Sequence, residues 1–127
     1  MAGWMGVDLD GTLAYYDGLK GPEYIGDPIP AMVDRVKKWL NEGREVRIFT
    51  ARVSCTDLVK KDDTRDDAKV AAVARKQIEA WCLMHIGVRL QVTAVKDFGM
   101  IELWDDRCVQ VQPNAGVPVH EFWRRSV

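Results

Sequence analysis

A chain of 127 residues that is 47% hydrophobic and 29% charged has the size and composition of one globular domain, which we expect to span residues 1–127. The formal net charge of -1 argues against bulk attraction to nucleic acid or to an anionic membrane, although a local patch remains open. No apolar run approaches the roughly 18 residues that cross a bilayer, and the N-terminus lacks the basic flank of a signal peptide, so we expect a cytoplasmic protein without membrane contact.

The first predicted element is a short apolar strand that begins at Trp4 and ends in two aspartates, Asp8 and Asp10. Residues two apart on a strand point to the same side, and Gly11 allows a sharp turn after them. Two neighbouring carboxylates repel each other unless one is protonated or a cation lies between them. Oxygen ligands of this kind favour Mg²⁺, whereas the alternative interpretation is a solvated turn rich in aspartate.

The order Asp-x-Asp-Gly-Thr after an apolar strand resembles the first motif of the haloacid dehalogenase (HAD) superfamily of phosphotransferases. The resemblance implies an α/β fold with a parallel sheet. It also implies that Asp8 is the nucleophile, that Asp10 is the general acid and base, and that both help to bind Mg²⁺. Gly11 and Thr12 then belong to the phosphate-binding loop.

Residues 15–30 are rich in glycine and proline and are predicted to form a turn followed by a flap. HAD proteins carry such a flap above the nucleophile. By position, the candidate substrate contacts are Tyr15, Tyr16, Lys20 and Tyr24. The alternative is that these aromatic side chains pack against their own domain.

Apolar residues recur at helical spacing from Ile29 to Leu40, and Gly43 is a plausible helix stop. A strand is predicted from Arg44 to Thr50, parallel to the first strand because a helix connects the two. Thr50 would then lie beside the two aspartates, at the sheet edge where α/β proteins bind ligands. An apolar strand ending in threonine resembles the second HAD motif, whose hydroxyl holds the phosphoryl group. Arg52 could bind phosphate with two hydrogen bonds, and a surface ion pair is an equal alternative.

The remaining pattern alternates helix and strand. Residues 53–67 are polar and highly charged and are predicted to be a solvated loop, followed by a helix over 68–86 that ends at Gly87. Strands are predicted around 90–94 and 101–104, and a short fifth strand around Val109 and Val111. Cys55, Cys82 and Cys108 contain no CxxC pair, so we expect reduced thiols and no zinc cluster.

The doublet Asp105-Asp106 follows the strand 101–104 and brings further carboxylates to the expected ligand edge. It resembles the fourth HAD motif, an acidic pair that completes Mg²⁺ coordination. A turn capped by Arg107 is the alternative. Which aspartate contacts the metal directly is left open by the sequence. The resemblance to related acidic pairs favours Asp106.

Lys96 is the natural candidate for the third HAD motif, a lysine that neutralises the nucleophile and the phosphate. If the third strand ended at Lys96, residues 97–100 would have to return to the far edge of the sheet, and four residues span at most about 14 Å. Either the strand ends near Gln91 and an irregular return brings Lys96 inward, or another cation, Arg52 or Lys60, takes the role.

The sequence therefore predicts a HAD-like α/β domain with a parallel sheet of about five strands, no large cap domain, and a C-terminal tail over 113–127. The expected activity is Mg²⁺-dependent hydrolysis of a phosphomonoester, either a phosphorylated small molecule or a nucleotide. Competing functions are a phosphatase acting on the 3'- or 5'-end of an oligonucleotide, a non-catalytic Mg²⁺ or phosphate-binding module, and a structural subunit. The oligomeric state is left open.

Overall fold

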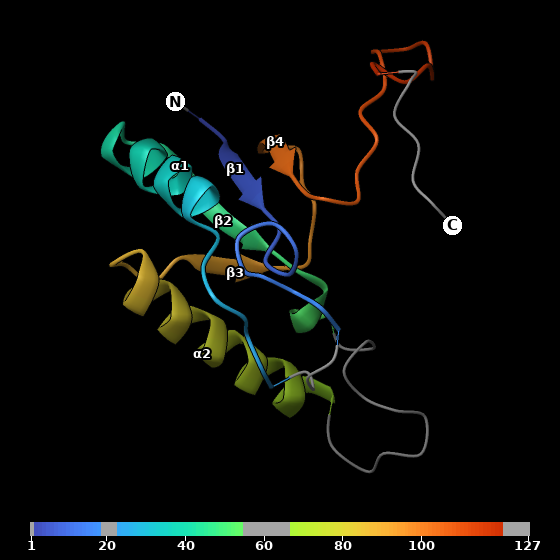
Figure 1. The fold of residues 1–127 in the computed structure, drawn as a ribbon. Coiled ribbons are helices and arrows are strands. Elements are labelled where there is room, and N and C mark those ends of the chain that lie inside the picture. The colour runs from blue at the N-terminus through green and yellow to red at the C-terminus, as the bar shows by residue number, and fades with distance from the viewer. Residues whose placement is uncertain (1, 19–22, 55–66, 121–127) are drawn as a thin grey trace.

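The computed structural model describes residues 2–18, 23–54 and 67–120. Along the chain the elements are β1 (Trp4–Val7), α1 (Pro30–Asn41), β2 (Glu45–Phe49), the 3-10 turn η1 (Ala51–Val53), α2 (Asp67–His85), β3 (Gln91–Thr93) and β4 (Met100–Trp104). Figure 1 shows the strands side by side with α1 and α2 packed against them. The predicted helices and the strands that bracket them are therefore confirmed, with small shifts of their ends.

The sheet has four strands in the order β3-β2-β1-β4, and every neighbouring pair is parallel. Two consecutive β-α-β units step in the same direction from β1 to β2 to β3. Since such crossovers are right-handed, both helices are expected on one face of the sheet. The predicted α/β fold with a parallel sheet is confirmed, and the carboxyl ends of all described strands lie at one edge.

One face of the sheet forms the core. Met5 and Val7 of β1 lie on the same face as their partners Val46 and Ile48 of β2, and all four are buried. They form one cluster with buried side chains of both helices: Met32, Val33, Val36 and Trp39 of α1, and Ala74, Ile78, Trp81 and Cys82 of α2. The periodic apolar residues of each helix thus face the same side of the sheet, which places the strand ends at the margin of a rigid core.

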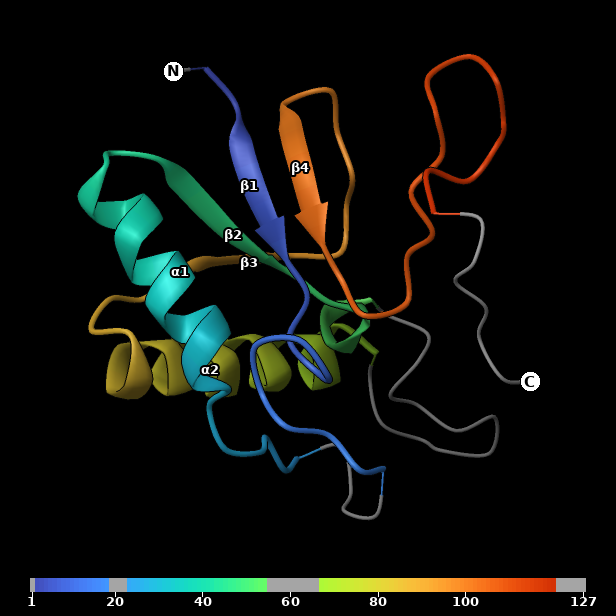
Figure 2. The ribbon, with the colours of Figure 1, turned by 45° about the horizontal axis from the view of Figure 1, so that its top comes forward.

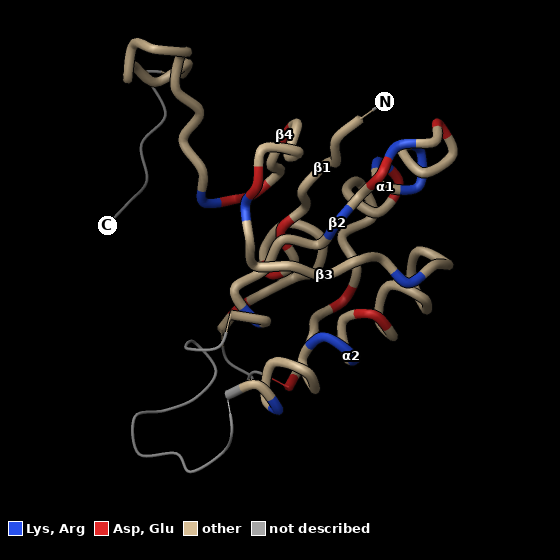
Figure 3. Tube along the Cα trace, turned by 180° about the vertical axis from the view of Figure 1, so that it is seen from behind, with Lys and Arg blue, Asp and Glu red and all other residues tan. Residues whose placement is uncertain are grey.

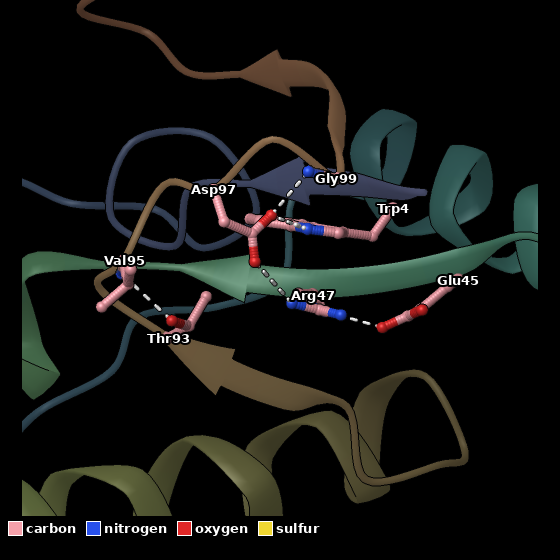
Figure 4. Close-up of polar contacts among 7 residues, drawn as sticks. All are labelled: Trp4, Glu45, Arg47, Thr93, Val95, Asp97 and Gly99. Atoms are coloured by element: carbon pink, nitrogen blue, oxygen red, sulfur yellow. Dashed lines mark hydrogen bonds and ion pairs between the residues drawn. The ribbon is translucent and has the colours of Figure 1, made fainter. Parts of the chain in front are cut away.

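The opposite face of the sheet has no described helix over it, and the segment 94–99 crosses it on the way from β3 to β4. Asp97 fixes this crossing: it accepts a hydrogen bond from Trp4 Nε1 at 2.8 Å and one from the Gly99 backbone N–H at 2.9 Å. Arg47 lies 3.6 Å from the other carboxylate oxygen of Asp97 and 4.6 Å from the Trp4 ring centroid. Figure 4 shows these side chains gathered over β1 and β2. One aspartate therefore ties the crossing to two strands.

The prediction of a fifth strand at Val109 and Val111 is wrong for the residues that the structure describes. After Trp104 the chain turns away from the sheet, as Figure 2 shows, and Val111 makes only an isolated antiparallel bridge with Pro118. The Arg107 backbone N–H bonds to Asp105 Oδ1 at 2.7 Å, and this turn redirects the chain. The apolar alternation at 109–111 serves a local hairpin-like loop instead of the sheet.

None of the helices in the described part of the chain is long and apolar enough to cross a membrane. Cys82 and Cys108 are free thiols, the first buried and the second exposed, whereas Cys55 lies outside the described residues.

Candidate metal and phosphate site

Three aspartates meet where β1 and β4 end. The two strands are parallel neighbours with Val7 opposite Trp104, and the Asp8 backbone N–H bonds to the Trp104 carbonyl oxygen at 2.9 Å. This register brings carboxylate oxygens of Asp8, Asp105 and Asp106 within 4.8 Å of one another. In Figure 3 the acidic segments that follow β1 and β4 are red and lie on neighbouring parts of the trace. Such a group of oxygen donors could hold a divalent cation.

The electrostatics of Asp8 fit that use. The pKa of Asp8 is raised to about 7, chiefly by burial and then by the charge of Asp105, a hydrogen bond to Asp106 and the charges of Asp106 and Asp10. Neighbouring carboxylates without a cation between them resist full ionisation. A bound divalent cation would reverse the effect, because it favours the ionised form of every ligand around it.

Gly11 and Thr12 support the site in a way that the sequence pattern did not predict. Gly11 has a φ of +88°, and a Cβ there would lie 2.6 Å from Asp106 Oδ2. The Thr12 hydroxyl accepts a hydrogen bond from the Asp106 backbone N–H at 3.0 Å and lies 3.3 Å from Asp106 Oδ1. Both residues therefore position Asp106. Their predicted role in phosphate binding stays a prediction.

Asp10 is turned toward Arg52. Arg52 Nε bonds to Asp10 Oδ2 at 2.7 Å and Arg52 Nη2 bonds to Asp10 Oδ1 at 2.8 Å. The same Nη2 donates to the Tyr24 carbonyl oxygen in the flap at 2.7 Å. Arg52 therefore forms a part-buried ion pair in this structure, and its predicted role in phosphate binding stays a prediction. The Asp10 carboxylate lies outside the group of three that could hold a metal, although we predicted it as a ligand.

Thr50 lies at the end of β2, where the sequence places it. Its side chain is buried, and its hydroxyl accepts a hydrogen bond from the Arg52 backbone N–H at 3.1 Å. Its own backbone N–H bonds to the Thr93 carbonyl oxygen at the end of β3, at 2.9 Å. An open pocket of about 350 Å³ joins these elements, which here is called the acidic pocket. Its lining consists of Asp8, Asp10, Tyr16, Phe49, Thr50, Ala51, Arg52, Asp105, Asp106 and Arg107.

Lys96 is exposed on the crossing segment, which begins directly after β3 ends at Thr93. The third strand thus ends short of Lys96, as the length argument requires. Within the described ranges Lys96 forms no ion pair with a carboxylate, and it does not line the acidic pocket. Burial raises the pKa of the Cys108 thiol, the charges of Asp105, Asp8 and Asp106 raise it further, and the charge of Lys96 lowers it. Lys60, an alternative to Lys96, and Lys20, a candidate substrate contact in the flap, lie outside the described residues.

Sequence reasoning missed two features of this site. Phe49 and Arg107 line the acidic pocket, and only their positions at the ends of β2 and β4 could have indicated them. The pairing of Arg52 with Asp10 was also missed as a specific contact. These residues are 42 positions apart, and no spacing rule links them.

Comparisons with known proteins support the fold. No protein-family model matches the chain, and no curated protein shows significant similarity to it. Among solved structures, a conserved protein coded by a locus from Bacteroides thetaiotaomicron is similar over 93% of this chain and 83% of its own, with a TM-score of 0.54 and 18% identity. A likeness at this identity speaks for the α/β fold alone.

Proposed function

We propose that the protein is a Mg²⁺-dependent phosphohydrolase that cleaves a phosphomonoester through a phosphorylated Asp8. The observation that carries the proposal is the group of Asp8, Asp105 and Asp106, whose oxygens lie within 4.8 Å of one another at the sheet edge where α/β proteins bind ligands. The resemblance of residues 8–12 to the first HAD motif supplies the reaction class.

The donor set fits Mg²⁺. It consists of carboxylate oxygens, and neither histidine nor cysteine belongs to the group, so softer metals gain little here. When bound, the cation would neutralise charge on the transferring phosphoryl oxygens and on the carboxylates. Asp8, Asp105 and Asp106 are the residues that would hold it.

The two halves of the reaction then divide between two aspartates. A carboxylate oxygen of Asp8 forms a bond to phosphorus while the bond from phosphorus to the leaving oxygen breaks, and Asp10 gives its proton to that oxygen. In the second half Asp10 takes a proton from water, the water oxygen bonds to phosphorus, and the bond to Asp8 breaks. Phosphate is released and both carboxyl groups return to their starting state.

Arg52 and Thr50 support these steps. Arg52 bonds to both carboxylate oxygens of Asp10, which fixes the position of this residue in the lining of the pocket. Thr50, at the end of β2, lines the same pocket, and in this proposal its hydroxyl contacts a phosphoryl oxygen. Among the described residues, the positive charges in the lining of the pocket are those of Arg52 and Arg107. Lys96 does not line the pocket, but it lies near enough to Cys108 for its charge to affect that thiol.

The test is hydrolysis of p-nitrophenyl phosphate with and without Mg²⁺. We expect activity that is lost in excess chelator and restored by added Mg²⁺, and we expect Asp8→Asn to abolish turnover because an amide does not attack phosphorus. Asp34→Asn, an exposed aspartate on α1, is the matched control and should retain full activity. A quenched reaction with ³²P-labelled substrate should label the wild-type protein and leave Asp8→Asn unlabelled.

The proposal fails if Asp8→Asn keeps more than about a tenth of the wild-type rate, a barrier difference of less than about 1.4 kcal/mol. Binding of Mg²⁺ and phosphate without turnover of any phosphomonoester would instead identify a non-catalytic binding module.

A further inference from the structure

Three tyrosines surround a second hollow beside the acidic pocket. Tyr15, Tyr16 and Tyr24 have exposed fractions of 63%, 52% and 45%, which is unusual for aromatic side chains that only serve a core. They line a cavity of about 190 Å³, here called the tyrosine hollow, together with Asp17, Gly18, Gly26 and Asp27. Tyr16 also lines the acidic pocket, so the two cavities adjoin at this residue.

The backbone that carries these tyrosines is fixed to the body of the protein. The Tyr15 N–H bonds to the Asp27 carbonyl oxygen at 2.8 Å, which pairs the two arms of the flap. Trp81 Nε1 of α2 donates to the Gly26 carbonyl oxygen at 3.0 Å, and this contact is buried. Arg52 holds the Tyr24 carbonyl oxygen at 2.7 Å while it holds Asp10. The hollow is therefore a preformed surface, which lowers the entropic cost of binding.

The chemistry of the lining selects the kind of group that fits. Exposed tyrosine rings offer flat faces for stacking, and stacking on a base tolerates any base because each has a π face. The carboxylate of Asp27 repels an anion and accepts hydrogen bonds from N–H groups. The hollow thus favours a flat, uncharged ring with N–H donors over a second phosphate.

The position of the hollow relates it to the leaving group. Arg52 links Asp10, the proposed acid, to the backbone of Tyr24, so the acid lies on the flap side of the acidic pocket. A leaving group protonated by Asp10 would extend past Tyr16, which borders both cavities. We propose that the tyrosine hollow binds the nucleobase of the substrate, so that the substrates are nucleotides. This inference rests on the proposed phosphohydrolase function.

The kinetic test compares adenosine 5'-monophosphate with ribose 5-phosphate, which lacks only the base. Stacking contributes enough for kcat/KM to be higher for the nucleotide by about fivefold or more. Tyr24→Leu should bring that ratio toward one, and Tyr24→Phe, which keeps the ring, should restore it. Phe98→Ala is the matched control, because Phe98 is a fully exposed aromatic on the crossing segment that lines neither cavity, and it should leave the ratio unchanged.

A binding test separates this inference from the catalytic one. Adenosine carries the base without a phosphate, so it cannot be hydrolysed; it should shift the NMR signals of the tyrosine rings, whereas ribose should not. Shifts without hydrolysis of any phosphomonoester would support the base site and refute the phosphohydrolase. Equal kcat/KM for the two substrates, with no shifts from adenosine, would refute the base site and leave the phosphohydrolase standing. A tyrosine-dependent preference for glucose 6-phosphate over the nucleotide would also overturn the proposal.

The source of the base is decided by a further comparison. Oligonucleotides with a 3'- or a 5'-phosphate are assayed beside the mononucleotide, in wild type and in Tyr24→Leu. A preference that is lost in Tyr24→Leu supports the base site, whichever substrate is preferred. If the mononucleotide is preferred, the protein is a mononucleotide phosphatase; if an oligonucleotide is preferred, it is a nucleic-acid end phosphatase.

Discussion

Arg52 donates two hydrogen bonds to the carboxylate of Asp10, at 2.7 and 2.8 Å. The same guanidinium donates a third hydrogen bond to the Tyr24 carbonyl oxygen and so connects Asp10 to the flap. A guanidinium matches a carboxylate in this planar arrangement, and a lysine ammonium does not. The pair is mostly buried, so removing one partner leaves an uncompensated charge in the other. Arg52 therefore acts on the proposed acid through orientation, and it couples that orientation to the flap.

Arg52→Lys should lower kcat on p-nitrophenyl phosphate by about tenfold or more, which is a barrier increase of about 1.4 kcal/mol or more. The reason is that one ammonium cannot fix both oxygens of Asp10. Arg44→Lys is the control, because Arg44 lies at the other end of β2 and its nearest described acid, Glu42, is 3.6 Å away on the surface. A kcat for Arg52→Lys equal to that of Arg44→Lys would show that Asp10 needs no such support.

The raised pKa of Asp8 predicts that the stability of the metal-free protein depends on pH. The pKa is 3.8 ordinarily and about 7 in the folded chain, so between these values the folded state holds a proton that the unfolded state has lost. The contribution of Asp8 to stability therefore falls as pH rises through this window. Asp8→Asn does not ionise, so the Tm of the variant minus that of wild type should grow from pH 4 to pH 8 in chelator, as measured by differential scanning calorimetry.

Saturating Mg²⁺ should narrow the same Tm difference at pH 8, because the cation stabilises ionised Asp8 only in the wild-type protein. A difference that stays constant with pH in chelator would mean that Asp8 is not the group that opposes ionisation.

Gly11→Ala should raise the Mg²⁺ concentration needed for half-maximal activity. Its Cβ would collide with the Asp106 carboxylate at 2.6 Å, and the positive φ adds strain of about 1–3 kcal/mol. Gly43→Ala isolates the strain, because Gly43 has a φ of +81° and a Cβ there meets nothing within 4 Å. Thermal unfolding should show a loss of stability in both variants, and a Mg²⁺ titration should show a shift only in Gly11→Ala. If the two variants need the same Mg²⁺ concentration for half-maximal activity, Gly11 does not help to position Asp106.

Asp105→Asn and Asp106→Asn should differ in kind. Loss of a direct ligand raises the Mg²⁺ requirement, whereas loss of a residue that orients a ligand mainly lowers the rate. Asp106 forms a hydrogen bond with Asp8, and its backbone N–H donates to the Thr12 hydroxyl. Asp105 instead accepts a hydrogen bond from the Arg107 backbone N–H. We expect the larger shift in Mg²⁺ requirement from Asp106→Asn, measured by titration of both variants. If neither rate nor requirement changes in either variant, the doublet is a surface turn.

Asp97 should stabilise the crossing segment in a pH-dependent way. The hydrogen bond from Trp4, with those from Gly99 and Met100 and the charge of Arg47, lowers the pKa of Asp97. Its contribution is present above the ordinary pKa and is lost as pH falls through the lowered one. Asp97→Ala should therefore reduce the Tm clearly at pH 7 and less at pH 3. Asp34→Ala serves as the exposed control on α1, and a reduction by Asp97→Ala that does not depend on pH would contradict the ionic part of the contact.

The sequence by itself determined the elements and the edge at which the site lies. Helical spacing from Ile29 to Leu40 and an apolar run ending at Thr50 follow local rules of periodicity, so they could be predicted without a fold. The parallel sheet followed from a helical crossover between strands, and with it the meeting of Asp8, Thr50 and Asp105 at one edge. The position of the Asp105-Asp106 doublet at this edge could be predicted in the same way, because the doublet follows a strand of the parallel sheet.

The tertiary structure decided which side chains touch. The register of β1 against β4, with Val7 opposite Trp104, brings Asp106 against Gly11 and Thr12, and no local pattern encodes a register across that distance. The prediction of a fifth strand was wrong because the turn at Asp105 directs the chain away from the sheet, despite the β propensity of Val109 and Val111. Lys96 is exposed because Asp97 ties the crossing to Trp4 and Arg47. Each of these outcomes depends on contacts between residues far apart in the chain, whose free energy appears only when the sheet is assembled.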